Sequence, residues 1–224
     1  HGSYDETYYR YLNLGLTVPF STGTDWFVYD FSRVYVPLAG ELTPGAWLKQ
    51  LAAGRTTITN GPLLEFTLDG RPVGETINVD GPTKLRARGR GVGRLDFRGL
   101  ELVKNGVVVA RAKSQATGGH FEAVLDVEVP LDGPGWLALR VPDVEQAKNE
   151  LDQPLFAHTS PVYVTVGRRK IFDRPTAELL LAEVKAAPEA IVQDGRFAEE
   201  AERERVLAVY REAVRTLEAR LAND

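Results

Sequence analysis

The fold of this chain is decided by a short stretch near its middle, LELVKNGVVVAR at residues 100–111. Two runs of mostly aliphatic and β-branched residues flank Asn105-Gly106. This pair suits the two central positions of a tight hairpin turn, because both positions need a positive φ. The stretch therefore predicts two antiparallel strands, Leu100–Lys104 and Val107–Arg111, joined by a two-residue turn.

The strand pattern extends on both sides of this hairpin. Leu64, Phe66 and Leu68 alternate with polar residues, which is typical of a strand with one buried face. Further strand candidates, separated by Gly and Pro, are Leu85–Arg88, Phe121–Val129, Trp136–Val141 and Val162–Val166. Many short strands at this spacing predict an antiparallel β-sandwich from about Thr56 to Val166. The glycine-rich, basic stretch Gly89–Arg94 falls between two candidates and is interpreted as a loop.

The region before the sandwich has the pattern of an α/β unit. A helix is predicted over Tyr4–Gly15, and Leu16–Phe20 is interpreted as a short buried strand that runs into Ser21-Thr22-Gly23-Thr24-Asp25. A second helix is predicted to begin at Thr43-Pro44, an N-cap followed by proline, and to end at Gly54. Functional groups in α/β folds collect where strands end, so the turn that contains Asp25 is the first candidate site.

The C-terminal region predicts two helices between Pro175 and Leu221, with a break at Pro188 and the second helix starting near Phe197. Their apolar faces carry five large residues at helical spacing: Leu180, Val184, Tyr210, Val214 and Leu217. We expect this helical hairpin to pack against the sandwich or against a part of a longer protein.

Composition limits the function classes. The 224 residues include 27 basic and 31 acidic side chains, a net charge of −4, which argues against a nucleic-acid-binding protein. No apolar run is long enough to span a bilayer. The absence of cysteine excludes disulfides, thiolate catalysis and Cys-ligated metals. The chain also lacks methionine and begins His1-Gly2-Ser3, so we expect a piece of a longer protein, with these three residues either native or tag-derived.

Few residues offer catalytic chemistry. Asp25 is interpreted either as a ligand for a metal or substrate or as the cap of a turn or short helix. In Gly54–Pro62, Arg55 could reach an anionic group, although a helix stop, a strand and a turn also explain that stretch. His158 is either a ligand or proton carrier or a hydrogen-bonded loop histidine, and His120 is expected to be solvated at a strand start. No two histidines have metal-site spacing, so no complete metal site is predicted.

Several of these stretches together resemble one family. The resemblance lies in Tyr9–Leu16, Ser21–Asp25, Ser32–Val36, Trp47–Thr56, Thr59–Pro62 and Ser160–Val164. These residues resemble the end of the catalytic domain and the following region in CehA/McbA-type metallohydrolases of the PHP (polymerase and histidinol phosphatase) superfamily. The resemblance implies a distorted β/α barrel that binds divalent metals, with Asp25 as the late aspartate ligand. The other ligands of that family have no counterpart in this chain and would lie upstream.

The resulting expectation is an α+β chain: residues 1–54 end a PHP-like α/β domain, residues 55–167 form the β-sandwich and residues 168–224 the C-terminal helices. The function implied by the resemblance is the C-terminal portion of a metal-dependent hydrolase of esters or phosphoesters, catalytically incomplete as given. The alternative is a non-catalytic module that recognises a carbohydrate or a protein partner. A divalent Zn, Mn or Mg ion is expected in the longer protein and none in this chain alone. The expected partners are the missing N-terminal part and a small-molecule substrate, but neither nucleic acid nor membrane. Oligomers are also possible, because the cut end of a barrel would expose apolar surface.

Overall fold

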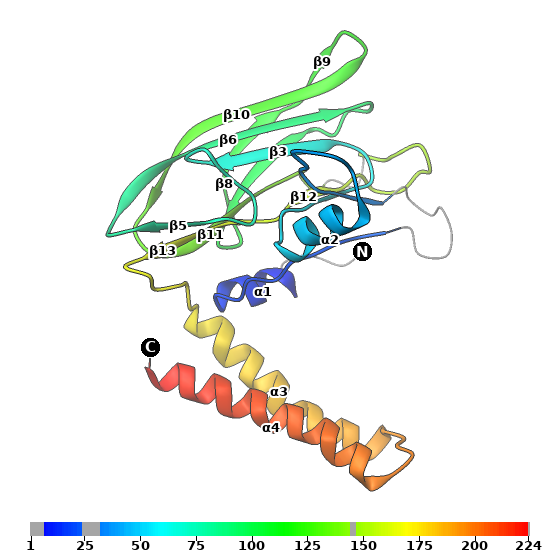
Figure 1. Ribbon diagram of the computed structural model, residues 1–224, viewed down its shortest axis with the longest axis vertical. Helices are drawn as coiled ribbons and strands as arrows, with labels where there is room; N and C mark the ends of the chain where they lie inside the picture. Colours follow the sequence, from blue (N-terminus) through cyan, green and yellow to red (C-terminus); the bar gives the residue numbers. More distant parts are fainter. Residues whose placement is uncertain (1–6, 24–31, 144–146, 224) are drawn as a thin grey trace. The chain divides into compact units, whose positions relative to one another are not determined.

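The computed structural model describes residues 7–23, 32–143 and 147–223, which form two compact units (Figure 1). The first unit ends at Ile171 and contains two short helices, α1 (Tyr8–Asn13) and α2 (Pro44–Ala52), together with the β-strands. The second unit begins at Phe172 and contains two long helices. In the described part of the chain, no helix is both long and apolar enough to cross a membrane.

The larger sheet of the first unit has eight strands. In chain order they are β1 (Arg33–Tyr35), β2 (Thr57–Thr59), β5 (Thr76–Val79), β7 (Gly99–Lys104), β8 (Val107–Lys113), β11 (Gly135–Arg140), β12 (Ala157–Thr159) and β13 (Val162–Val166). One path through the sheet follows the order β1-β2-β12-β11-β13-β5, and β7 pairs with β11 and β8. All pairs are antiparallel except β5 with β13, which run parallel. The prediction of a wholly antiparallel sandwich is therefore wrong at this pair.

The smaller sheet has five strands in the order β4-β3-β6-β10-β9, and all of its pairs are antiparallel. Its members are β3 (Leu63–Leu68), β4 (Arg71–Pro72), β6 (Thr83–Gly93), β9 (Gln115–Thr117) and β10 (His120–Leu131). The two long strands β6 and β10 lie side by side along its middle (Figure 1).

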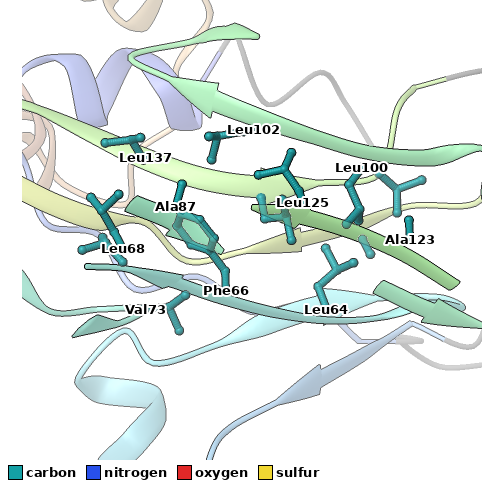
Figure 2. Packing of buried hydrophobic residues seen from close by; sticks show 14 of the residues in the cluster. Leu64, Phe66, Leu68, Val73, Ala87, Leu100, Leu102, Ala123, Leu125 and Leu137 are labelled. Carbon is teal, nitrogen blue, oxygen red and sulfur yellow. The ribbon is translucent and has the colours of Figure 1, made fainter. Parts of the chain in front are cut away.

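The main core is formed by the facing surfaces of the two sheets (Figure 2). Leu64, Phe66 and Leu68 of the smaller sheet belong to one buried cluster with Leu100 and Leu102 of the larger sheet. Each large side chain that is fully buried contributes about 1.5–3 kcal/mol relative to an exposed one. The alternating apolar residues Leu64, Phe66 and Leu68 thus form part of the inward face of the sandwich.

The hairpin prediction at residues 100–111 is confirmed. The turn between β7 and β8 has φ values of 52° at Asn105 and 90° at Gly106. The Asn105 side chain also accepts a hydrogen bond from the backbone N–H of Trp136 at 2.8 Å, and the Asn105 N–H donates to the Trp136 carbonyl at 3.1 Å. The turn is therefore fastened to the neighbouring strand β11.

The interpretation of Gly89–Arg94 as a loop is wrong, because residues up to Gly93 belong to β6. The glycines of this strand face the core. A Cβ added to Gly89 would lie 2.8 Å from a methyl carbon of Leu139, and one added to Gly91 would lie 2.9 Å from a methyl carbon of Leu100. Glycine is needed here because the leucines of the opposite sheet fill the space that a side chain would take.

The N-terminal predictions are confirmed in part. A helix is present at α1, and α2 begins after Thr43, whose Oγ1 accepts a hydrogen bond from the N–H of Ala46. The buried strand predicted at Leu16–Phe20 is wrong: this segment belongs to no strand, and Leu16 is 42% exposed. The described residues contain no α/β barrel, and β1 pairs directly with β2 of the sandwich.

The second unit consists of α3 (Arg174–Asp194) and α4 (Glu200–Asn223), so the prediction of two C-terminal helices is confirmed. Pro188 does not break α3 as expected but lies inside it. Proline removes one intrahelical hydrogen bond, a loss that a long helix packed against a second helix can tolerate. The five apolar residues predicted for the hairpin faces are all half-buried.

Candidate functional site

Part of the second face of the eight-stranded sheet is covered by α1, and this contact defines the candidate site. Tyr8, Tyr9 and Leu12 of α1 are buried in one cluster with Val103 of β7 and Trp136 of β11. The Trp136 indole N–H donates to the Asn13 side-chain oxygen at 2.8 Å. The Tyr9 ring packs on the Trp136 ring with centroids 4.8 Å apart. Strand β11 is therefore buried on both faces.

Tyr9 reaches a fully buried histidine, His158 of β12. The Tyr9 hydroxyl and His158 Nε2 are 2.8 Å apart, and His158 Nδ1 is 2.6 Å from the Thr159 carbonyl oxygen. A carbonyl only accepts hydrogen bonds, so Nδ1 carries the proton and Nε2 accepts from the tyrosine. Burial, reinforced by the nearby Arg140, lowers the pKa of His158 to about 3. The imidazole is therefore neutral at physiological pH.

A charged pair extends the hydrogen-bond chain. The Arg140 guanidinium donates from Nη1 to the Tyr9 hydroxyl at 3.3 Å and from Nε to Glu101 Oε2 at 2.9 Å. The second carboxylate oxygen of Glu101 accepts from Arg111 Nε at 2.9 Å. The Glu101 side chain is only 8% exposed, and two arginines compensate the cost of burying its charge. Arg111, Glu101, Arg140, Tyr9 and His158 therefore form one continuous network, called the Tyr9–His158 network below.

A second set of contacts holds the segment after α1. The Tyr8 hydroxyl donates to the Val18 carbonyl at 3.1 Å, and the Tyr8 ring stacks on Phe20 with centroids 4.5 Å apart. The Thr56 hydroxyl donates to the Phe20 carbonyl at 2.9 Å and lies 2.7 Å from the Ser160 hydroxyl. Because the Thr56 proton is used on Phe20, Ser160 is the donor in that pair.

These contacts position a segment rather than activate a group. Both ring nitrogens of His158 are engaged, and burial raises the pKa of Tyr8 far above its ordinary value and that of Tyr163 to about 12. Across the described residues every buried side-chain nitrogen and oxygen has a hydrogen-bond partner. Tyr9 and His158 are also almost completely shielded from solvent, at 2% and 0% exposure. The contacts fix α1 and the segment up to Phe20 on the sheet.

The residues singled out from the sequence are distributed as follows. Asp25 lies outside the described residues. Arg55 donates to Glu75 at 3.3 Å and so has an internal partner. Asn60 is buried in the connection from β2 to β3, donates to the Pro154 carbonyl and accepts from the Phe156 N–H. His120 is half-buried at the start of β10. His158 is hydrogen-bonded, as the second of its two interpretations predicts, but it lies in strand β12 and not in a loop.

The described residues do not supply a metal site. No group of three or more His, Asp or Glu side chains among them is arranged to hold a metal ion. Of the two histidines in the described residues, His158 is fully buried, and its ring nitrogens are occupied by Tyr9 and Thr159.

The sequence reasoning missed Tyr9, Glu101 and Arg140. One signal was available for their neighbourhood: Gly135–Leu139 shows no polar alternation and is buried throughout, as expected of a strand covered on both faces. That pattern predicts a cover on the outer face of the sheet, although it does not say which segment provides it.

The outer face of the five-stranded sheet carries a second candidate site, a shallow groove of about 260 Å³ between Arg88, Arg90 and Val124. Its two arginines and Asp126 take part in ion pairs. Arg86 makes two bonds of 2.6 and 3.0 Å to Asp126 and holds the pKa of that carboxyl below its usual value. Arg90 donates to Glu122 at 2.6 Å.

Comparison with known proteins identifies no relative. No protein-family model, no curated protein and no solved structure matches this chain.

Proposed function

We propose that this chain is the C-terminal portion of a metal-dependent hydrolase of ester or phosphoester bonds, in which the β-sandwich has a structural role. It holds α1 and the segment up to Phe20, which precedes Asp25 in the sequence. Asp25 would be one metal ligand, and the remaining ligands and a PHP-like barrel would come from a preceding part of a longer protein.

The observation that carries this proposal is the fastening of α1 and the following segment by residues that are distant in sequence. Tyr9 bonds to His158, Asn13 to Trp136, and the Phe20 carbonyl to Thr56. These bonds are buried or partly buried, where loss of one partner leaves an unsatisfied group at a cost of about 1–3 kcal/mol. A catalytic ligand must be held to within about half an ångström, and an anchored segment just before it supports such a role.

A divalent ion at Asp25 would supply Lewis-acid activation of the substrate and of a bound water. No group of three or more metal-ligating side chains occurs among the described residues, so the proposal depends on Asp25 and on ligands from outside this chain.

The test is made in the longer protein, with Asp25→Asn and the matched control Asp30→Asn. Metal content is measured by mass spectrometry and hydrolysis with p-nitrophenyl phosphate, bis-p-nitrophenyl phosphate and p-nitrophenyl acetate, each with Zn²⁺, Mn²⁺ or Mg²⁺. Asparagine keeps the shape of the side chain and removes its charge. We expect Asp25→Asn to lower metal content and activity together, and Asp30→Asn to change neither. Unchanged metal content and activity in Asp25→Asn would refute the assignment.

The structural role of the sandwich has a separate test. Tyr9→Phe removes one hydroxyl from the Tyr9–His158 network, whereas Tyr11→Phe removes one from a side chain that is 40% exposed. We expect Tyr9→Phe to raise severalfold the metal concentration that gives half-maximal activity in the longer protein, and Tyr11→Phe to leave it unchanged. Equal metal dependence in both variants would show that the network does not position the metal site.

The alternative of a carbohydrate-binding module has less support. Sugar rings commonly stack on exposed aromatic side chains, and the groove on the five-stranded sheet is bordered by arginines, acids, Thr67 and Val124, with its one aromatic residue, Phe66, directed into the core.

A further inference from the structure

The second unit has almost no interior of its own. Among its described residues only Ala177 of α3 and Leu207 of α4 are fully buried. Leu179, Val192 and Val209 are 46%, 48% and 67% exposed. Other apolar side chains are half-buried, namely Leu180, Leu181, Val184, Ile191, Val206, Tyr210, Val214 and Leu217. Two helices cannot bury these residues by themselves, because each helix can shield only one side of the other.

An apolar groove lies between the two helices near their turn. Pro188 and Val192 of α3 and Leu207 of α4 line it, with Glu189 and Gln193 on one side and Arg211 on the other. Its volume is about 320 Å³. It begins about 20 Å along α3 from Arg174, at a rise of about 1.5 Å per residue. The groove therefore lies toward the turn between α3 and α4, away from the end of the hairpin at which α3 begins.

We propose that this groove is an interface with a second copy of the same chain, in which two hairpins pack face to face as an antiparallel four-helix bundle. This proposal does not depend on the hydrolase assignment. The helical pattern in the sequence is also compatible with packing against the sandwich or a preceding domain. Here the partner of the hairpin is a second copy of the chain.

The dimensions of the hairpin fit a dimer. Helices of 21 and 24 residues offer a face about 30 Å long, and two adjacent helices are about 20 Å wide. Such a face removes about 600 Å² from solvent on each copy, or about 1,200 Å² in total, which is the lower limit of a stable interface. Four helices packed in this way are the usual arrangement in which amphipathic helices of this length bury their apolar faces.

The charges beside the groove fit the symmetry of a dimer. Glu189 lies on the α3 side and Arg211 on the α4 side. With the two-fold axis parallel to the helices, both turns lie at the same end and α3 of each copy lies against α4 of the other, so Glu189 of each copy faces Arg211 of the other. Arg211 also pairs with Glu204 of its own helix at 3.0 Å, and both of these side chains are more than half exposed. One guanidinium can serve both carboxylates.

The first experiment measures the mass of the 224-residue chain in solution by sedimentation equilibrium over a wide concentration range. We expect twice the mass of one chain, with dissociation on dilution. Val192→Asp places a charge in the groove and should weaken the dimer about tenfold or more. Val209→Asp is the matched control. Val209 is two positions from Leu207, and therefore about 200° around α4 from the groove at about 100° per residue, so this variant should keep the wild-type dissociation constant.

The second experiment reverses the charges. Glu189→Arg and Arg211→Glu should each weaken the dimer, because each creates two like-charge pairs across the interface. The double variant Glu189→Arg/Arg211→Glu restores opposite charges and should recover most of the affinity. A wild-type chain that is monomeric at all concentrations overturns the proposal, and so does a dimer that Val192→Asp and Val209→Asp weaken equally. Failure of the double variant to recover would overturn the antiparallel pairing.

Discussion

The two units of this chain differ in how they hold their structure. The first unit buries a continuous cluster between two sheets and a second cluster under α1. The described part of the second unit buries two residues, and ion pairs such as Lys185 with Glu218 lie on its surface. Exposed ion pairs stabilise a protein by about 0–1 kcal/mol each. The first unit therefore depends on its own interior, whereas the second depends on what it packs against.

Tryptophan positions make this difference measurable. Trp26, Trp47 and Trp136 all precede Phe172, so tryptophan fluorescence follows unfolding of the first unit alone. Circular dichroism at 222 nm is dominated by α3 and α4, which contain most of the helical residues described. The effect of a substitution on the unfolding of each unit can therefore be followed by a different signal.

The largest expected effect comes from the interior of the first unit. Leu102→Ala removes a fully buried side chain of β7 and should lower the free energy of unfolding by about 2–5 kcal/mol, from lost burial and the cavity left behind. Urea unfolding followed by tryptophan fluorescence measures it. Leu63→Ala in the same unit and Leu179→Ala in the hairpin change side chains that are 48% and 46% exposed, and each should shift this transition by about 0.5 kcal/mol or less. Equal effects at all three positions would contradict the contrast between the units.

An intermediate effect comes from the buried histidine of the first unit. The pKa of His158 is about 3 when folded and about 6.5 when unfolded, so between these values the unfolded chain binds a proton that the folded chain does not. The free energy of unfolding should therefore fall as pH decreases below about 6.5, by up to about 1.4 kcal/mol per pH unit. The pKa of Asp96 is lowered by its bond from Ser114, and that of Asp126 by Arg86. Such carboxylates add a slope of the same sign, but only at lower pH.

Two variants assign this pH dependence. His158→Gln should remove most of the slope between pH values of about 6.5 and 4.5, whatever its effect on stability at neutral pH. His120→Gln changes the half-buried histidine of β10 and should keep the slope. A slope that persists in His158→Gln would mean that another group binds the proton.

The fold was predictable where local sequence chemistry determines the structure. The turn at Asn105-Gly106 and the alternation of Leu64, Phe66 and Leu68 report backbone conformation and burial within a few residues. The segment Leu16–Phe20 misled the prediction because a short apolar run gives no period. It contains Pro19, which has no N–H for a strand partner. Gly89–Arg94 was misread because glycine suggests a turn unless the leucines of the opposite sheet are known.

The candidate site was less predictable than the fold. Tyr9 and His158 are separated by 149 residues, and the contact between them depends on the order of the strands and on α1 covering the outer face. Neither fact can be deduced from spacing along the chain. Glu101 stands between Leu100 and Leu102 in β7, which marks it as unusual but does not identify Arg140 as its partner. The metal-ligand prediction at Asp25 rests on the family resemblance, and it stays a prediction.

The smallest expected effect belongs to the second unit and concerns the start of α3. The Asp173 carboxylate accepts a hydrogen bond from the N–H of Thr176 at 3.0 Å and lies at the positive end of the helix dipole. Asp173→Ala removes both interactions and should destabilise the hairpin by about 1 kcal/mol, seen as an earlier transition in circular dichroism at 222 nm. Tryptophan fluorescence should not change. Asp194→Ala is the matched control, because Asp194 is the last residue of α3, where a negative charge faces the negative end of the dipole. This variant should leave the transition unchanged or move it slightly later. If Asp173→Ala moves the circular dichroism transition earlier and Asp194→Ala does not, the termini of α3 stabilise a unit that unfolds separately. A shift of the fluorescence transition in Asp173→Ala would instead show that the two units unfold together.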